Sequence, residues 1–106
     1  MISIKNGAKL DGLRAEILLG FFIIAQVFSE HEYDVTMTEA TGGDHMKTSL
    51  HYKGLALDIR SKNIISKDMK HQILEECVIA LGDNYDFIIE DEGQPNEHFH
   101  VEFDPQ

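Results

Sequence analysis

Hydrophobic residues recur at intervals of three and four positions over residues 10–32, the spacing of one face of an α-helix. The positions that carry this pattern are Leu13, Ile17, Phe21, Ile24 and Phe28. Four further apolar residues widen the stripe: Leu18, Phe22, Ile23 and Val27. We therefore expect a helix that is buried on much of its circumference.

A second helical pattern follows Ser66, which is a suitable N-cap, and Asp68 falls in the first turn. Apolar residues continue on one face at Met69, Ile73, Cys77 and Ala80. Gly82 is expected to end this helix, because glycine adopts the backbone conformations found at helix C-termini.

Four other segments are rich in β-branched and aromatic residues, or alternate between apolar and polar residues, and predict strands. They are residues 33–40, 55–60, 85–90 and 98–103, with a loop at 41–48 and a turn at 93–96. The order helix, strands, helix, strands predicts an α+β fold with a small, mainly antiparallel sheet packed against two helices. No repeat or linker divides residues 1–106, so we expect a single domain.

Charge and hydropathy argue against two classes of partner. The formal net charge of −10 (9 Lys+Arg against 19 Asp+Glu) repels nucleic-acid backbones, so no nucleic acid is expected. The longest apolar run, residues 17–28, contains Gly20 and Gln26 and is shorter than the roughly 20 residues that cross a bilayer. We therefore expect no membrane insertion and, because no cleavage site follows the run, no signal peptide.

Histidines provide the first indication of chemistry. Six are present, and His45, His51, His98 and His100 fall in predicted loops or strand edges rather than on apolar helical faces. A single histidine of this kind is usually an ordinary surface or hydrogen-bonded residue. Four of them, in a chain of 106 residues, favour a metal site.

Strand parity strengthens this interpretation, because side chains two positions apart point to the same side of a sheet. In the last predicted strand His98, His100 and Glu102 share one face, while the apolar residues take the other. In the strand at 55–60, Asp58 lies on the polar face with Arg60. If the two strands are neighbours, Asp58 and His100 lie on the same side of the sheet.

A catalytic zinc ion needs about three protein ligands and one position for water, and His51, Asp58 and His100 supply two imidazoles and a carboxylate. Zinc lowers the pKa of its bound water and polarises a carbonyl group. Glu97, three residues before His100, is the candidate general base. The alternative is that Glu97 is a solvated loop carboxylate.

The segment from Ser49 to Asp58 resembles a known family. It matches the pattern Ser-x-His-x-x-Gly-x-Ala-x-Asp at five fixed positions: Ser49, His51, Gly54, Ala56 and Asp58. This pattern is the signature of the zinc peptidases that include D-alanyl-D-alanine carboxypeptidases, L-alanyl-D-glutamate endopeptidases and phage endolysins. The family's second element, Glu-x-x-His, is similar to Glu97-His98-Phe99-His100.

The resemblance implies a fold like that of the hedgehog and D-Ala-D-Ala peptidase domains. It also implies zinc ligands at His51, Asp58 and His100, a general base at Glu97, and peptidoglycan stem peptides as substrate. Gly54 would permit the turn into the strand. Such a protein would be made in the cytoplasm of a bacterium or a phage-infected host and would act on the cell wall after release.

Three further residues have roles that the resemblance leaves less defined. Ser49 is expected to bond near the ligand loop and, together with His45, to line the substrate side. His98 would either stabilise the developing oxyanion and orient substrate, or form a hydrogen bond in the shell around the ligands. Both interpretations of His98 stay open.

One departure from the family pattern favours other functions. Many members carry a substrate-holding arginine before the signature, and residues 33–50 contain none; Lys47, Lys53 or His45 would have to replace it. A non-catalytic zinc-binding module is the first alternative. Zinc as a purely structural ion, with His98 or His45 as a fourth ligand, is the second. The bond cleaved and the oligomeric state are left open by the sequence.

Overall fold

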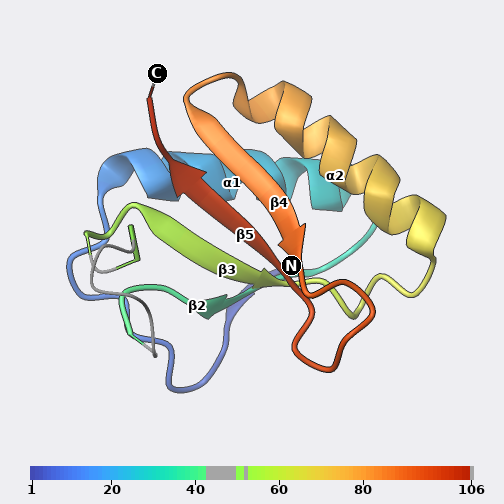
Figure 1. The fold of residues 1–106 in the computed structure, drawn as a ribbon, viewed down its shortest axis with the longest axis horizontal. Helices are drawn as coiled ribbons and strands as arrows, with labels where there is room; N and C mark the ends of the chain where they lie inside the picture. The colour runs from blue at the N-terminus through green and yellow to red at the C-terminus, as the bar shows by residue number, and fades with distance from the viewer. Residues whose placement is uncertain (43–49, 52, 106) are drawn as a thin grey trace.

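The computed structural model describes residues 1–42, 50–51 and 53–105. In chain order the elements are β1 (Ile2–Ile4), α1 (Ala15–Glu30), β2 (Val35–Glu39), β3 (Ala56–Arg60), α2 (Lys67–Leu81), β4 (Tyr85–Glu90) and β5 (His98–Phe103). The strands form one sheet; in the view of Figure 1, α1 passes behind it and α2 lies beside β4. Within the described ranges the opposite face of the sheet carries no helix, and this face is called the open face below.

The strand order in the sheet is β1-β2-β3-β5-β4. β1 and β2 are parallel, and the other three pairings are antiparallel. The expected α+β fold with a mainly antiparallel sheet and two helices is confirmed. The pairing of β3 with β5, which are separated in the sequence by residues 61–97, brings the two halves of the sequence motif together.

The hydrophobic core fills the space between the helices and the sheet. Phe28 of α1 packs edge-on against Phe99 of β5, with ring centroids 6.0 Å apart. The alternate positions of the two central strands are fully buried: Leu57, Ile59, Phe99 and Val101. The residues between them therefore face the open side, as the parity of the sequence predicts.

The two helices differ in how well the sequence predicts their ends. The hydroxyl of Ser66 accepts a hydrogen bond from the Met69 amide, and Gly82 follows the last residue of α2, as expected. The first helix begins at Ala15, later than the predicted residue 10, because Gly12 has a positive φ of 80° and Arg14 is extended. No helix in the described part of the chain is long and apolar enough to cross a membrane.

The first strand has no counterpart among the predicted elements. β1 contains only three residues, all exposed, and pairs with β2 through Ile2↔Val35 and Ile4↔Met37. An alternation of two apolar residues is too short to distinguish from a loop. The expected loop at 41–48 lies mostly outside the described residues, which resume at Leu50.

Gly54 makes the turn that leads from the ligand segment into β3. Its φ is 73°, and its carbonyl oxygen accepts a hydrogen bond from the amide of Arg14 at 3.0 Å. A Cβ atom at this position would lie 2.0 Å from the carbonyl oxygen of Gly12. The expectation that glycine is required here for the turn is confirmed, with close backbone packing as an additional reason.

Replacing Gly54 with alanine is therefore expected to destabilise the fold strongly, because the new methyl group meets backbone that cannot rotate away. Gly93→Ala is the matched control, since Gly93 has a φ of 82° but open space at its Cβ position. The positive φ alone costs about 1–2 kcal/mol. Urea unfolding should show a clearly larger loss for Gly54→Ala; equal losses would mean that the contact with Gly12 relaxes.

Candidate metal centre

The open face of the sheet brings together Asp58 of β3 and His100 of β5. They are direct cross-strand partners in the antiparallel pairing, so their side chains project to the same side. The Nδ1 atom of His100 lies 3.0 Å from Oδ1 of Asp58. The structure thus confirms the predicted neighbourhood of these two strands and the shared face of these two residues.

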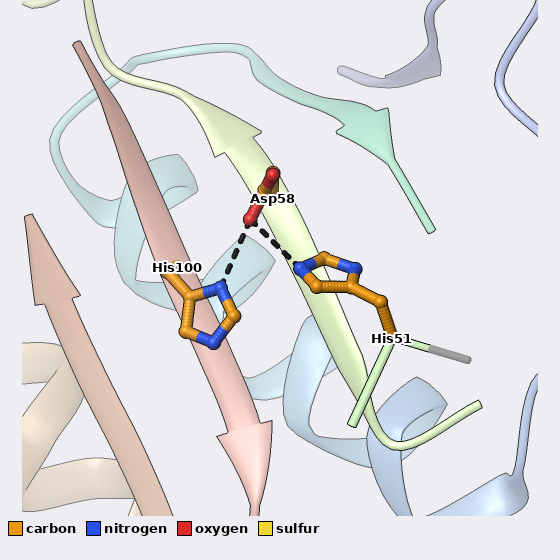
Figure 2. A group of neighbouring side chains, drawn as sticks. All are labelled: His51, Asp58 and His100. Carbon is orange, nitrogen blue, oxygen red and sulfur yellow. Dashed lines mark hydrogen bonds and ion pairs between the residues drawn. The ribbon is translucent and has the colours of Figure 1, made fainter. Parts of the chain in front are cut away.

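His51 reaches the same carboxylate from the turn before β3 (Figure 2). Its side chain is only 3% exposed, and its Nδ1 atom lies 2.7 Å from the carbonyl oxygen of Ala40. Because a carbonyl can only accept, Nδ1 carries a proton, and Nε2 is the nitrogen that would bind a metal ion in place of its own proton. Nε2 lies 3.2 Å from Oδ1 of Asp58, so this nitrogen is directed into the site.

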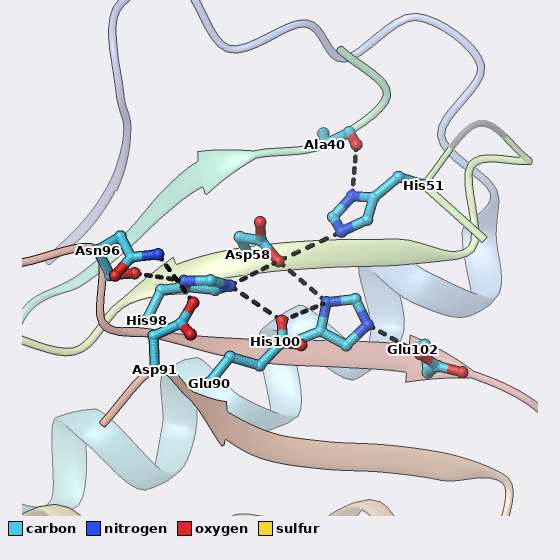
Figure 3. A network of polar contacts seen from close by, with 9 residues as sticks. All are labelled: Ala40, His51, Asp58, Glu90, Asp91, Asn96, His98, His100 and Glu102. Carbon is cyan, nitrogen blue, oxygen red and sulfur yellow. Dashed lines mark hydrogen bonds and ion pairs between the residues drawn. The ribbon is translucent and has the colours of Figure 1, made fainter. Parts of the chain in front are cut away.

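Glu102 orients the ring of His100 in a comparable way. The Nε2 atom of His100 lies 2.8 Å from Oε1 of Glu102, which accepts its proton and turns Nδ1 toward Asp58 (Figure 3). The sequence places Glu102 on the face of His100 but indicates no role for it. Carboxylates that hold the remote nitrogen of a histidine ligand in this manner are common around metal ions.

The three side chains form a donor set that fits a divalent cation. One nitrogen of His51, one oxygen of Asp58 and one nitrogen of His100 lie within 4.8 Å of one another. Both imidazoles have their remote nitrogen bonded to an acceptor, which leaves the near nitrogens as potential ligands. The residues predicted as metal ligands are therefore brought together, and they can hold a metal ion.

Without a metal ion, Asp58 and His100 form a compact ion pair. Burial raises the pKa of Asp58, but the hydrogen bonds from His100 and His51 outweigh it and hold that pKa well below its usual range. Burial lowers the pKa of His100, but its hydrogen bonds to Asp58 and Glu102 and the charges of Asp58 and Glu90 raise it to about 9. A cation that binds here replaces the His100 proton as the partner of Asp58.

Glu97, the predicted general base, lines the same pocket as Asp58 and His98 and is held there by three hydrogen bonds. Its buried carboxylate accepts hydrogen bonds from Ser61 Oγ at 2.6 Å, from Lys70 Nζ at 2.7 Å and from the Gly93 amide at 3.1 Å. Lys70 belongs to α2, so this carboxylate is tied to the helical layer of the molecule. The structure does not place Glu97 among the described donor atoms that could hold a metal ion.

His98 lies on the open face, as predicted, and contacts a residue that the sequence does not single out. Its Nδ1 atom lies 2.8 Å from the carbonyl oxygen of Asn96, and its Nε2 atom lies 3.0 Å from Oε1 of Glu90. Glu90 is its cross-strand partner on β4. Only the register of β4 against β5 reveals this contact, and no local sequence pattern provides that register.

A pocket of about 410 Å³ adjoins the cluster and contains three basic residues, although the protein as a whole is acidic. These residues, Lys5, Arg60 and Lys62, line it together with His98 and three acidic residues, Glu39, Asp58 and Glu97. The pocket therefore carries balanced charges, with basic groups beside the candidate metal ligand Asp58. Parity places Arg60 on this face, but the sequence does not identify it as a substitute for the missing arginine.

Two residues that the sequence places on the substrate side fall outside the described part of the chain. His45 and Ser49 lie outside the described residues, as does Lys47, one of the proposed replacements for the arginine. Lys53 is described and lies in the turn after His51, where its amide donates to the carbonyl of Leu50 at 3.1 Å. It does not line the pocket that holds Arg60.

Replacing Glu102 with alanine is expected to weaken zinc binding by about 10- to 100-fold, the usual effect of losing a carboxylate that orients a histidine ligand. Asp86→Ala is the matched control, because Asp86 lies opposite Glu102 on β4, is exposed, and removes the same charge. Zinc affinity measured by competition with a fluorescent chelator distinguishes the two. Equal weakening in both variants would mean that Glu102 acts only through its charge.

Comparisons with known proteins return no match: none of the family models, curated proteins or solved structures searched corresponds to this chain. The resemblance to zinc peptidases therefore rests on the motif residues alone.

Proposed function

We propose that this protein is a zinc peptidase that hydrolyses peptide bonds in the stem peptides of bacterial peptidoglycan. The bond would be of the D-Ala-D-Ala carboxypeptidase or L-Ala-D-Glu endopeptidase type. One observation carries the proposal: Nε2 of His51 and Nδ1 of His100 converge on a single oxygen of Asp58. All three residues occupy the ligand positions of the sequence motif.

The donor set favours zinc among the divalent metals. Two imidazoles and one carboxylate are typical of catalytic zinc sites, which keep a further position for water or substrate. When bound, zinc would supply a Lewis acid that activates water and polarises the scissile carbonyl. The chain contributes the orientation of the two imidazoles, through Ala40 and Glu102. A hedgehog and D-Ala-D-Ala peptidase-like fold is part of the same proposal.

Arg60, in the pocket next to the ligands, supports a peptide with a carboxylate as substrate. Stem peptides of peptidoglycan carry carboxylates at D-glutamate and at the C-terminus, and Arg60 is suited to bind one of them because its guanidinium forms paired hydrogen bonds to carboxylates. Lys5 and Lys62 line the same pocket. A carboxylate held there would place an adjacent peptide bond beside Asp58.

Hydrolysis also needs a group that takes a proton from water and passes it to the leaving nitrogen. The resemblance assigns this step to Glu97, which would first have to leave Lys70 and Ser61. Glu90 is the alternative, because its Oε1 atom already lies 3.7 Å from Nδ1 of His100. Glu97→Gln and Glu90→Gln separate the two: the base is the residue whose loss abolishes turnover while zinc stays bound.

A non-catalytic zinc-binding module is the second candidate function. The hydrogen bonds that occupy the Glu97 carboxylate favour it, since they leave the motif's expected base engaged in a structural ion pair. Such a module would bind zinc through the same three ligands and would bind peptides without cleaving them.

Mass spectrometry of stem peptides incubated with zinc-loaded protein tests the proposal. A chelator-treated sample and the Asp58→Ala variant are the controls. We expect zinc-dependent cleavage, with the released masses identifying the bond; the cell wall would then be the place where the protein acts. Intact peptides, in a sample that contains stoichiometric zinc, would favour the non-catalytic module.

A further inference from the structure

His98 repeats the arrangement that makes His51 a candidate ligand. Its Nδ1 atom bonds to a backbone carbonyl, that of Asn96, at 2.8 Å, just as His51 bonds to Ala40 at 2.7 Å. Because the carbonyl accepts the Nδ1 proton, Nε2 of His98 faces carboxylates, to which it donates without a metal and beside which it could bind a cation in place of its proton. These are Glu90 Oε1 at 3.0 Å and Asp58 Oδ1 at 3.7 Å.

Glu90 extends over the two histidines of β5 from the edge strand β4. Its Oε1 atom lies 3.0 Å from Nε2 of His98 and 3.7 Å from Nδ1 of His100 (Figure 3). Donor atoms of Asp58, Glu90 and His98 lie within 4.8 Å of one another. This second group of donors therefore lies directly beside the first and shares Asp58 with it.

The charge of the site leaves room for more than one dication. Three carboxylates, Asp58, Glu90 and Glu102, contact the histidines of the open face. With one divalent cation bound and the imidazoles neutral, these carboxylates still leave the site with an excess of negative charge. A second dication would change the net charge of this group from −1 to +1, and pairs of metal ions about 3.5–4 Å apart are found in aminopeptidases and nucleases.

We infer that Asp58, Glu90 and His98 bind a second divalent transition-metal ion next to the proposed zinc, with the Asp58 carboxylate shared between the two. The inference rests on the proposed function because it takes the first site as occupied. The second ion binds more weakly, since the Glu90 side chain is 42% exposed and two like charges share one ligand. One imidazole and two carboxylates suit Zn²⁺ or Mn²⁺.

Isothermal titration of the metal-free protein with zinc, together with the metal content after dialysis, tests this inference. We expect a tight event and a second one, weaker by about tenfold or more, in the wild-type protein. His98→Ala and Glu90→Gln should each remove the weak event and leave the tight one. His71→Ala is the matched control, because His71 forms a similar pair with Glu92 on another part of the surface.

A single binding event in the wild-type protein would overturn the inference. So would a weak event that persists in both variants, or a His98→Ala variant that loses the tight event. The result is separable from the peptidase proposal, because binding is measured without substrate. Two bound ions without cleavage would contradict the peptidase proposal and support the second metal site. Cleavage with one bound ion would support the peptidase proposal and contradict the second site.

Discussion

Replacing Asp58 with alanine is expected to abolish tight zinc binding and to lower peptide cleavage by orders of magnitude. Its Oδ1 atom is the point on which the nitrogens of His51 and His100 converge, so its loss removes the shared carboxylate of the site. Loss of a residue that merely orients a ligand costs about 10- to 100-fold in metal affinity, and loss of a ligand should cost more. Zinc content after dialysis and the cleavage rate measure the two effects.

Asp86→Ala is the control for this experiment, because it removes an exposed carboxylate from the neighbouring strand β4. The melting temperature of both variants in chelator shows whether each is folded. If a folded Asp58→Ala variant had wild-type zinc content and turnover, Asp58 would not be a zinc ligand.

Replacing Glu97 with glutamine is expected to destabilise the fold far more than the loss of an exposed carboxylate does. The Lys70 ammonium would stay 12% exposed without its ionic partner, and breaking one side of a buried ion pair typically costs about 3–5 kcal/mol. Urea unfolding measures the change. Glu92→Gln, which disrupts the more exposed pair with His71, is the control and should change stability much less.

Glu97 should also make the stability of the fold sensitive to acid. Burial raises the pKa of Glu97, but the hydrogen bonds from Lys70, Ser61 and the Gly93 amide prevail and lower it from 4.5 to about 2. A carboxylate with a lowered pKa in the folded state stabilises the fold above its unfolded pKa. That contribution is lost as the pH falls from about 4.5 toward 2, and the loss should be smaller in Glu97→Gln. Identical acid unfolding curves would contradict this account.

The parity of side chains in strands predicted the core of the site. Asp58 and His100 occupy polar positions between buried residues, and that alternation alone places them on one face once β3 and β5 pair. Gly54 was likewise predictable, since the motif requires a turn there. These features depend on the local geometry of strands and turns, which can be predicted from neighbouring residues in the sequence.

Glu97 illustrates what a motif can obscure. Its carboxylate bonds to Lys70 of α2, a contact between distant segments that the Glu-x-x-His spacing does not indicate. Glu97 also lines the pocket that contains Asp58 and His98, and its role as the base stays a prediction. Glu90 was missed for another reason: its contact with His98 depends on the register of β4 against β5, which no local pattern encodes.

Anomalous diffraction from crystals of the zinc-loaded protein, recorded on both sides of the zinc absorption edge, would locate the ion directly. We expect the strongest peak to lie among Nε2 of His51, Oδ1 of Asp58 and Nδ1 of His100. A strongest peak at the other acidic group of the surface, Asp86, Glu102 and Asp104, with none beside Asp58, would contradict the proposed metal centre.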